Sequence, residues 1–227
     1  MTKSGLIVLA TVLLAMVSLV PPHAAVAADD DSAMVEVAML TYGTRNKTSV
    51  CFSDKFLRDV AYETGVQVDR DFVDVRLRSE DLFDYPFAIM SGEGTFELTA
   101  EEVANVRAYV NGGGFLLASA GCSSSAWNVA MRRAMDRIFP DNELVELEVD
   151  HPVFQTVWDI TEFESKKRRR TVRVYGIEIE GRLAVVYSPE GLNDTRNAGG
   201  SCCCCGGNEL RNARYVNANI LAYALTK

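Results

Sequence analysis

The sequence predicts an α/β fold in which helices sandwich a mostly parallel β-sheet. Short apolar runs of strand type alternate along the chain with amphipathic helical patterns, and this alternation is typical of βαβ units. The runs at residues 87–90 and 115–119 are almost entirely apolar, as expected of strands that are buried on both faces. Two later runs, at residues 172–180 and 182–187, flank a Glu-Gly turn and predict a β-hairpin.

The first part of the chain predicts two strands separated by a helix. Residues 34–41 form a nearly continuous apolar run, and Ser53 is expected to open a helix that Gly65 ends. Residues 66–75 are a second extended segment, and residues 79–83 a single helical turn.

Two further helices are expected in the middle of the chain. Thr99 and Glu102 have the capping-box spacing for a helix that the three glycines at residues 112–114 end. Ser125 is expected to cap a third helix, which stops before Pro140 because proline disfavours helical geometry in the residue before it.

The last part predicts a strand at residues 144–149, then the hairpin, then a turn-rich stretch at residues 188–207. An amphipathic helix follows over about residues 208–225. The order contains no internal repeat, so residues 29–227 are expected to form one domain.

The amino terminus has the features of a secretory signal peptide. Lys3 supplies a positive charge, residues 5–20 are almost wholly apolar, and an Ala-Val-Ala cleavage pattern follows at residues 25–27. The apolar run is shorter than the about 18 to 20 residues that span a bilayer, which disfavours a transmembrane anchor. We therefore expect residues 1–28 to be removed and the mature protein to be periplasmic or extracellular.

Composition excludes several classes of protein. The 227 residues are 48% hydrophobic and 24% charged, so collagen-like, low-complexity and wholly disordered chains are excluded. Lys3 is the only charged residue of the predicted signal peptide, so the mature chain carries 22 lysines and arginines against 31 acidic residues. Such an acidic surface does not attract nucleic acid, so no nucleic-acid partner is expected.

Five segments, in this order and spacing, carry a resemblance to a known family. They are residues 82–87 (Leu-Phe-Asp-Tyr-Pro-Phe), 92–96 (Gly-Glu-Gly-Thr-Phe), 98–102 (Leu-Thr-Ala-Glu-Glu), 113–117 (Gly-Gly-Phe-Leu-Leu) and 150–154 (Asp-His-Pro-Val-Phe). The chain resembles the bacterial domain-of-unknown-function family 4159, within the class I glutamine amidotransferase-like superfamily. The resemblance implies a flavodoxin-like sandwich and names no activity, because a fold alone does not define a function.

All six cysteines fall in loops that are expected at one edge of the sheet. Ligands of open parallel sheets bind beyond the carboxyl ends of the strands, and Cys51 and Cys122 each lie in a loop between such a strand end and a helix. Four consecutive cysteines precede the last helix. We therefore expect one cysteine-rich rim, completed by Cys202, Cys203, Cys204 and Cys205.

Cys122 and His151 are the candidate catalytic residues. The resemblance implies a nucleophilic cysteine on a strand-to-helix turn at the position of Cys122, and a helix amino terminus favours the thiolate. However, Ser123 follows Cys122 where the family elbow has glycine, and the late His-x-Glu pair of amidotransferases is absent from the sequence. The general base for Cys122 would have to be His151, because it is the one histidine of the mature chain. Glutaminase activity is therefore disfavoured.

Three states of the cysteines stay open. An exported protein favours disulfides, for which six cysteines suffice. Zinc is the one cofactor considered, held by two thiolates of the four-cysteine run together with Cys51 and Cys122, although the run lacks C-x-x-C spacing. Free or redox-active thiols are the third state.

A glycine-rich turn supplies the candidate ligand-binding residues. Gly92, Glu93 and Gly94 follow a buried strand and precede a helix, where backbone amides can hold an anion. Glu93 is the best carboxylate for a ligand contact, and Ser123 lies on the neighbouring turn. The alternative is a tight loop that only supports the rim.

A basic run stands out in this acidic chain. It is either a solvated loop before the hairpin or a patch that docks on anionic lipid headgroups or an acidic partner. The run consists of Lys166, Lys167, Arg168, Arg169 and Arg170.

The sequence thus predicts, first, an exported non-amidotransferase module that binds a small molecule or an envelope protein. The second hypothesis is a thiol-dependent hydrolase or redox enzyme that uses Cys122. The third is a structural component of an envelope assembly, with peripheral membrane contact through the basic run.

Overall fold

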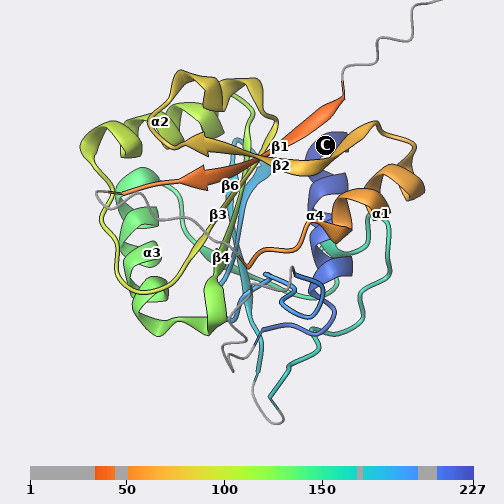
Figure 1. The fold of residues 1–227 in the computed structure, drawn as a ribbon. Helices are drawn as coiled ribbons and strands as arrows, with labels where there is room; N and C mark the ends of the chain where they lie inside the picture. Colours follow the sequence, from red (N-terminus) through yellow and green to blue (C-terminus); the bar gives the residue numbers. More distant parts are fainter. Residues whose placement is uncertain (1–33, 44–50, 168–170, 199–208) are drawn as a thin grey trace, which may run out of the picture. The chain divides into compact units, whose positions relative to one another are not determined.

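The computed structural model describes residues 34–43, 51–167, 171–198 and 209–227. These residues form a seven-stranded sheet with helices around it (Figure 1). The strand order is β2-β1-β3-β4-β7-β6-β5. Strands β1, β2, β3, β4 and β7 are parallel, and β6 and β5 continue the sheet in antiparallel pairings. The predicted α/β fold with a late hairpin is confirmed. The elements are β1 (Val35–Thr41), α1 (Lys55–Thr64), β2 (Val68–Arg76), η1 (Glu80–Asp84), β3 (Phe87–Gly92), α2 (Ala100–Asn111), β4 (Phe115–Ala120), η2 (Gly121–Ser123), α3 (Ser125–Ile138), β5 (Val145–Leu147), η3 (Pro152–Phe154), β6 (Val174–Ile179), β7 (Arg182–Ser188) and α4 (Ala213–Thr226).

Helices cover both faces of the sheet (Figure 1). On one face, Phe56 of α1 and Ile220 of α4 pack with Ile89 and Leu117 of the central strands. On the other face, α2 and α3 pack against the alternate residues of the same strands, such as Met90. Burial on both sides explains why these strands are apolar in sequence.

The ends of the helices follow the predicted capping chemistry in part. Thr99 and Glu102 form the predicted capping box on α2. Ser124, one residue before the expected Ser125, caps α3 by accepting a hydrogen bond from the Trp127 amide. The last helix begins at Ala213 rather than near residue 208, because residues 209–212 make turn contacts instead.

No helix in the part of the chain that the structure describes has both the length and the apolarity to cross a bilayer. The predicted signal peptide, residues 1–28, lies outside the described residues.

The β6–β7 hairpin turns at Glu180 and Gly181, as predicted. Both residues have positive φ, 51° and 78°, which is the geometry of a two-residue turn that favours Asn-Gly. Glutamate is a poor residue for the first position because its Cβ crowds the backbone at positive φ.

We predict that Glu180→Asn stabilises the fold by about 0.5–1 kcal/mol, because asparagine adopts positive φ more readily. In a domain of this size the melting temperature should rise by about 2 °C. Glu178→Asn is the matched control, because it removes the same charge from an exposed position on β6, where asparagine brings no turn benefit. Equal effects of the two substitutions in thermal unfolding would contradict the prediction.

Candidate functional site

The carboxyl ends of the parallel strands β1, β3, β4 and β7 meet at one edge of the sheet, which we call the carboxyl edge. The loops that leave it begin at residues 42, 93, 121 and 189. The Cys51–Ser53 segment also reaches this edge, since the Ser53 amide donates a hydrogen bond to the Asn193 carbonyl at 2.9 Å. Segments far apart in sequence therefore share one surface.

A row of three buried serines forms the floor of the carboxyl edge on the α1–α4 side. Ser91, Ser119 and Ser188 are in-register neighbours on β3, β4 and β7 and are fully buried. The Asn193 side chain accepts a hydrogen bond from Ser119 Oγ at 2.9 Å and donates one to Ser91 Oγ at 3.1 Å. The Leu192 amide donates to Ser119 Oγ at 2.7 Å. These bonds fix the loop after β7 across the ends of β3 and β4.

Tyr42 and Trp127 support the same edge from the opposite face. The Tyr42 hydroxyl donates to the Ser91 carbonyl at 2.9 Å and accepts from Trp127 Nε1 at 2.6 Å. Burial raises the pKa of the Tyr42 hydroxyl well above its ordinary value, an effect that the Trp127 hydrogen bond only partly opposes. The hydroxyl therefore stays protonated and keeps its donor role. Gly92 leaves the space that this pair occupies.

Cys122 and Ser123 follow β4 with unusual backbone geometry. Their φ angles are 54° and 53°, a left-handed conformation that costs a residue with a Cβ roughly 1–2 kcal/mol. Ser123 Oγ donates to the Glu190 carbonyl at 2.5 Å, which ties this turn to the loop after β7. Strain of this kind is concentrated at functional sites.

Cys122 is disulfide-bonded in the structure. Its sulfur lies 2.9 Å from Glu93 Oε1, and because a disulfide sulfur has no proton to donate, this is a close contact rather than a thiol hydrogen bond. In this state Cys122 is neither a nucleophilic thiolate nor a metal ligand.

The Gly92–Glu93–Gly94 turn is held by α3. The Gly94 amide donates to Ser124 Oγ at 3.0 Å, so this amide is already engaged by the protein. The geometry therefore favours the tight-loop interpretation of the turn over an anion cradle. Glu93 itself is exposed at the carboxyl edge beside Cys122.

Glu209 is a site residue that sequence reasoning missed. It is buried, and its carboxylate accepts hydrogen bonds from the Cys122 amide at 3.3 Å and from Thr195 Oγ1 at 2.6 Å. Glu209 therefore joins the turn after β4 to the segment before α4. The sequence placed Glu209 at the start of the expected last helix, where a glutamate gives no signal for this role.

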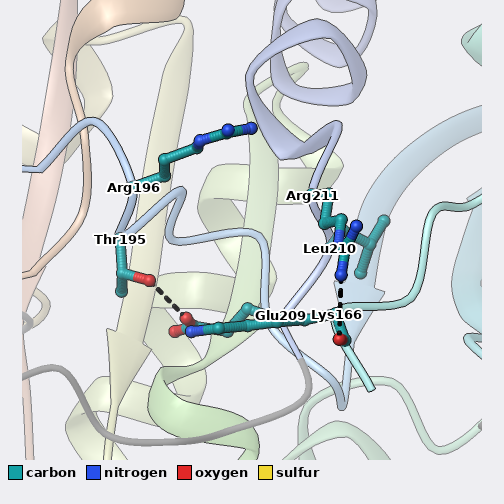
Figure 2. A pocket seen from close by; sticks show the side chains of 6 residues that line it. All are labelled: Lys166, Thr195, Arg196, Glu209, Leu210 and Arg211. Atoms are coloured by element: carbon teal, nitrogen blue, oxygen red, sulfur yellow. Dashed lines mark hydrogen bonds between the residues drawn. The ribbon is translucent and has the colours of Figure 1, made fainter. Parts of the chain in front are cut away.

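A pocket of about 450 Å³ opens beside Glu209. The Lys166 amide donates to the Glu209 carbonyl at 3.2 Å, and the Arg211 amide donates to the Glu164 carbonyl at 2.8 Å. Thr195 and Arg196 approach from the other side (Figure 2). We call this the cationic pocket; it is lined by Lys166, Thr195, Arg196, Glu209, Leu210 and Arg211.

His151 lies in a different environment. Its Nδ1 accepts a hydrogen bond from the Val153 amide at 3.1 Å, and its ring centroid is 6.4 Å from that of Tyr223. Burial lowers the pKa of His151, an effect that the charges of Glu178 and Asp150 partly oppose. These contacts are those of a capping residue in a turn.

The expected Cys122–His151 pair is not formed in the structure. Tyr223, the neighbour of His151, belongs to the last turn of α4, whereas Cys122 contacts Glu209 ahead of the first turn. A 14-residue helix is about 20 Å long. The two residues thus contact opposite ends of α4, and His151 is not placed to act as a base for Cys122.

The predicted cysteine-rich rim can be followed only in part. Cys51 is buried beside the carboxyl edge, and Cys122 lies on it. Cys202, Cys203, Cys204 and Cys205 lie outside the described residues, as do residues 168–170 of the basic run. Within the described ranges, no three histidine, cysteine or acidic side chains are grouped to hold a metal ion.

The fold and the carboxyl edge define an α/β protein with a candidate ligand site beyond the ends of its parallel strands. A family model described as "Domain of unknown function (DUF4159)" matches residues 36–225. The match covers most of the chain, which therefore belongs to this family. No curated protein matches the sequence.

We predict that Gly92→Ala destabilises the fold by about 2 kcal/mol, as overpacking does in a filled core. An added Cβ would lie 2.4 Å from the Tyr42 hydroxyl and 3.1 Å from Trp127 Nε1. Tyr42→Phe removes the first clash while costing its own hydrogen bonds.

A double-mutant cycle by denaturant unfolding checks the cause. The Gly92→Ala, Tyr42→Phe double variant should be at least about 1 kcal/mol more stable than the two single costs together imply, since contacting residues are coupled. Simple additivity would show that the Tyr42 hydroxyl is not what excludes a side chain at Gly92.

Proposed function

We propose that this protein is an exported binding module of class I glutamine amidotransferase-like architecture that binds a small molecule at the carboxyl edge and is not a glutaminase. The observation that carries the proposal is the convergence of three loops, those after β3, β4 and β7, on one polar surface. The Gly94–Ser124 hydrogen bond joins the loop after β3 to the turn after β4, and the Ser123–Glu190 hydrogen bond joins that turn to the loop after β7. Glu93 is exposed on this surface, and the cationic pocket opens beside Glu209.

The strand order supports the superfamily part of the proposal. The five parallel strands β2-β1-β3-β4-β7 follow the order 2-1-3-4-5 of flavodoxin-like sheets. In such sheets the ligand binds beyond the carboxyl ends of the strands, near the point where the strand order reverses. Here that point lies between β1 and β3, and Glu93 leaves β3 there.

The geometry of the two candidate catalytic residues argues against glutamine hydrolysis. A cysteine nucleophile needs a free thiolate and a base within hydrogen-bond reach. Cys122 is disulfide-bonded, and His151 contacts the far end of α4.

A redox role of Cys122 is the second candidate. The observation that favours it is the strained turn, because Cys122 and Ser123 both have positive φ directly after β4. Cys122→Ser separates the candidates: a binding module retains its ligand affinity in this variant, whereas a thiol-disulfide oxidoreductase loses its activity towards a dithiol substrate.

Export is the other part of the proposal, and it rests on the apolar leader with its Ala-Val-Ala pattern at residues 25–27. We predict that the protein recovered from the periplasm or medium begins at Ala28 or Asp29, as amino-terminal sequencing would show. Ala27→Leu should block cleavage, since the small residue at this position is what the peptidase recognises. An intact Met1 on the protein recovered outside the cytoplasm would contradict this prediction.

We predict that a ligand of the wild-type protein protects the carboxyl edge from hydrogen–deuterium exchange. The full chain would be screened by thermal shift against phosphorylated, carboxylated, amino and neutral sugar compounds, with glutamine included. Protection should appear at residues 92–94, 121–124 and 188–196, because these loops enclose the proposed site. The peptide over residues 68–76, the β2 edge strand, serves as an internal control.

Two results would overturn the proposed function. One is a ligand that protects only residues away from the carboxyl edge. The other is ammonia release from glutamine by the wild-type protein that Cys122→Ser abolishes, since that would establish a working cysteine nucleophile.

A further inference from the structure

We infer that the cationic pocket recognises the phosphate group of a small molecule. This inference rests on the proposed binding at the carboxyl edge and names the chemistry of the ligand. It starts from the charges that line the pocket.

Three cationic side chains, Lys166, Arg196 and Arg211, line one pocket in a chain with a net charge of −8. All three are exposed, and none forms an ion pair with another residue that the structure describes. By contrast, Arg214 nearby is neutralised by Asp59. The three cations therefore have charge to offer to a ligand.

The one acidic side chain of the pocket is already occupied. Glu209 is buried, and its two oxygens accept hydrogen bonds from the Cys122 amide and from Thr195 Oγ1. Asp194, adjacent in sequence, is likewise held by two hydrogen bonds from Asn197 Nδ2. Burial raises the pKa of the Asp194 carboxyl. The hydrogen bonds from Asn197 and the charges of Arg214 and Arg196 partly oppose this rise. Within the described residues, neither carboxylate forms an ion pair with Lys166, Arg196 or Arg211.

The backbone holds the cations on opposite sides of the pocket. Ser165 and Leu210 form an antiparallel bridge that joins the two segments, and Arg211 Nη2 donates a hydrogen bond to the Lys166 carbonyl at 3.4 Å, which holds Arg211 beside Lys166. Arg196 extends from the loop that Asn193 anchors to β3 and β4 (Figure 2). Helix α4 begins two residues after Arg211, and its amino end adds a further positive potential. An anion between these groups needs little rearrangement of the backbone.

Charge and size select a phosphate over a single carboxylate. The lining carries three positive charges and one negative, so its formal charge is +2. A phosphate monoester carries about −1.5 to −2 at neutral pH, whereas a carboxylate carries one. Arginine also binds phosphate through two parallel hydrogen bonds. A volume of about 450 Å³ is that of a site for a whole small molecule, so the phosphate is one part of a larger ligand.

The test measures binding of inorganic phosphate to the full chain by titration calorimetry, at constant ionic strength maintained with chloride. Arg196→Ala and Arg211→Ala should each weaken binding at least about tenfold, which corresponds to about 1.4 kcal/mol. Arg196→Lys should weaken it less, because lysine keeps the charge but loses the paired hydrogen bonds. Arg70→Ala is the matched control, since it removes an exposed arginine from β2, outside the pocket.

A second arm identifies the source of the phosphate. Phosphatidylcholine vesicles with and without phosphatidic acid are sedimented with the wild-type and the variant proteins. Binding of inorganic phosphate alone indicates a soluble phosphorylated compound, and sedimentation that needs both phosphatidic acid and Arg196 indicates a lipid headgroup. Either result supports phosphate recognition by the pocket.

The inference is overturned if neither probe binds, or if Arg196→Ala and Arg211→Ala bind as tightly as Arg70→Ala. The failure of the proposed function is distinct from this. A neutral or amino ligand that protects the carboxyl edge would preserve the proposed function while removing the phosphate inference. Phosphate bound through the arginines without protection of residues 92–94 and 121–124 would preserve the pocket while removing the wider site.

Discussion

The hydrogen bonds of Asn193 are the constraint on which the carboxyl edge depends. Parallel strands present their ends at one edge but do not fix the loops that leave it. Asn193 does so by bonding to Ser91 and Ser119, the terminal polar residues of β3 and β4. All three residues are buried, so losing one partner would leave the others unsatisfied, at a cost of about 1–3 kcal/mol for each group. The loop after β7 therefore has one favoured position.

That position determines which groups meet. Residues 195 and 196 continue directly from the anchored loop, so Thr195 reaches Glu209 and Arg196 reaches the cationic pocket. Gly191 makes the approach possible, because its φ is 103° and a Cβ there would lie 2.4 Å from the Ala120 carbonyl. Glu209 then bonds to the Cys122 amide at the end of β4. The buried serine row and the exposed cations are thus linked by a short run of hydrogen bonds.

The sequence predicted the fold well because local patterns encode it. Apolar runs marked β3 and β4, and Thr99 with Glu102 marked the start of α2. The same residues also show where local patterns stop being informative. Glu102 accepts a second hydrogen bond, from the Gly43 amide at 2.7 Å, which anchors the loop after β1 to α2. This contact joins residues 59 positions apart, and no periodicity or capping rule specifies it.

The candidate site was predicted less well than the fold, for a related reason. Strand order predicts that Cys51, Glu93 and Cys122 lie near one edge, because the ends of parallel strands share an edge. Pairing Cys122 with His151 required knowing which end of α4 each residue contacts, and that depends on how residues 151–164 run along the helix. Asn219 and Asn212 bind that segment through its backbone. Asn219 holds Trp158 and Asn212 holds Glu164, so the chain runs from the end of α4 towards its start. His151 is therefore at the far end from Cys122, while Lys166 arrives at the near end, where Arg196 and Arg211 already lie. The segment that separates the expected catalytic pair is thus the one that completes the cationic pocket.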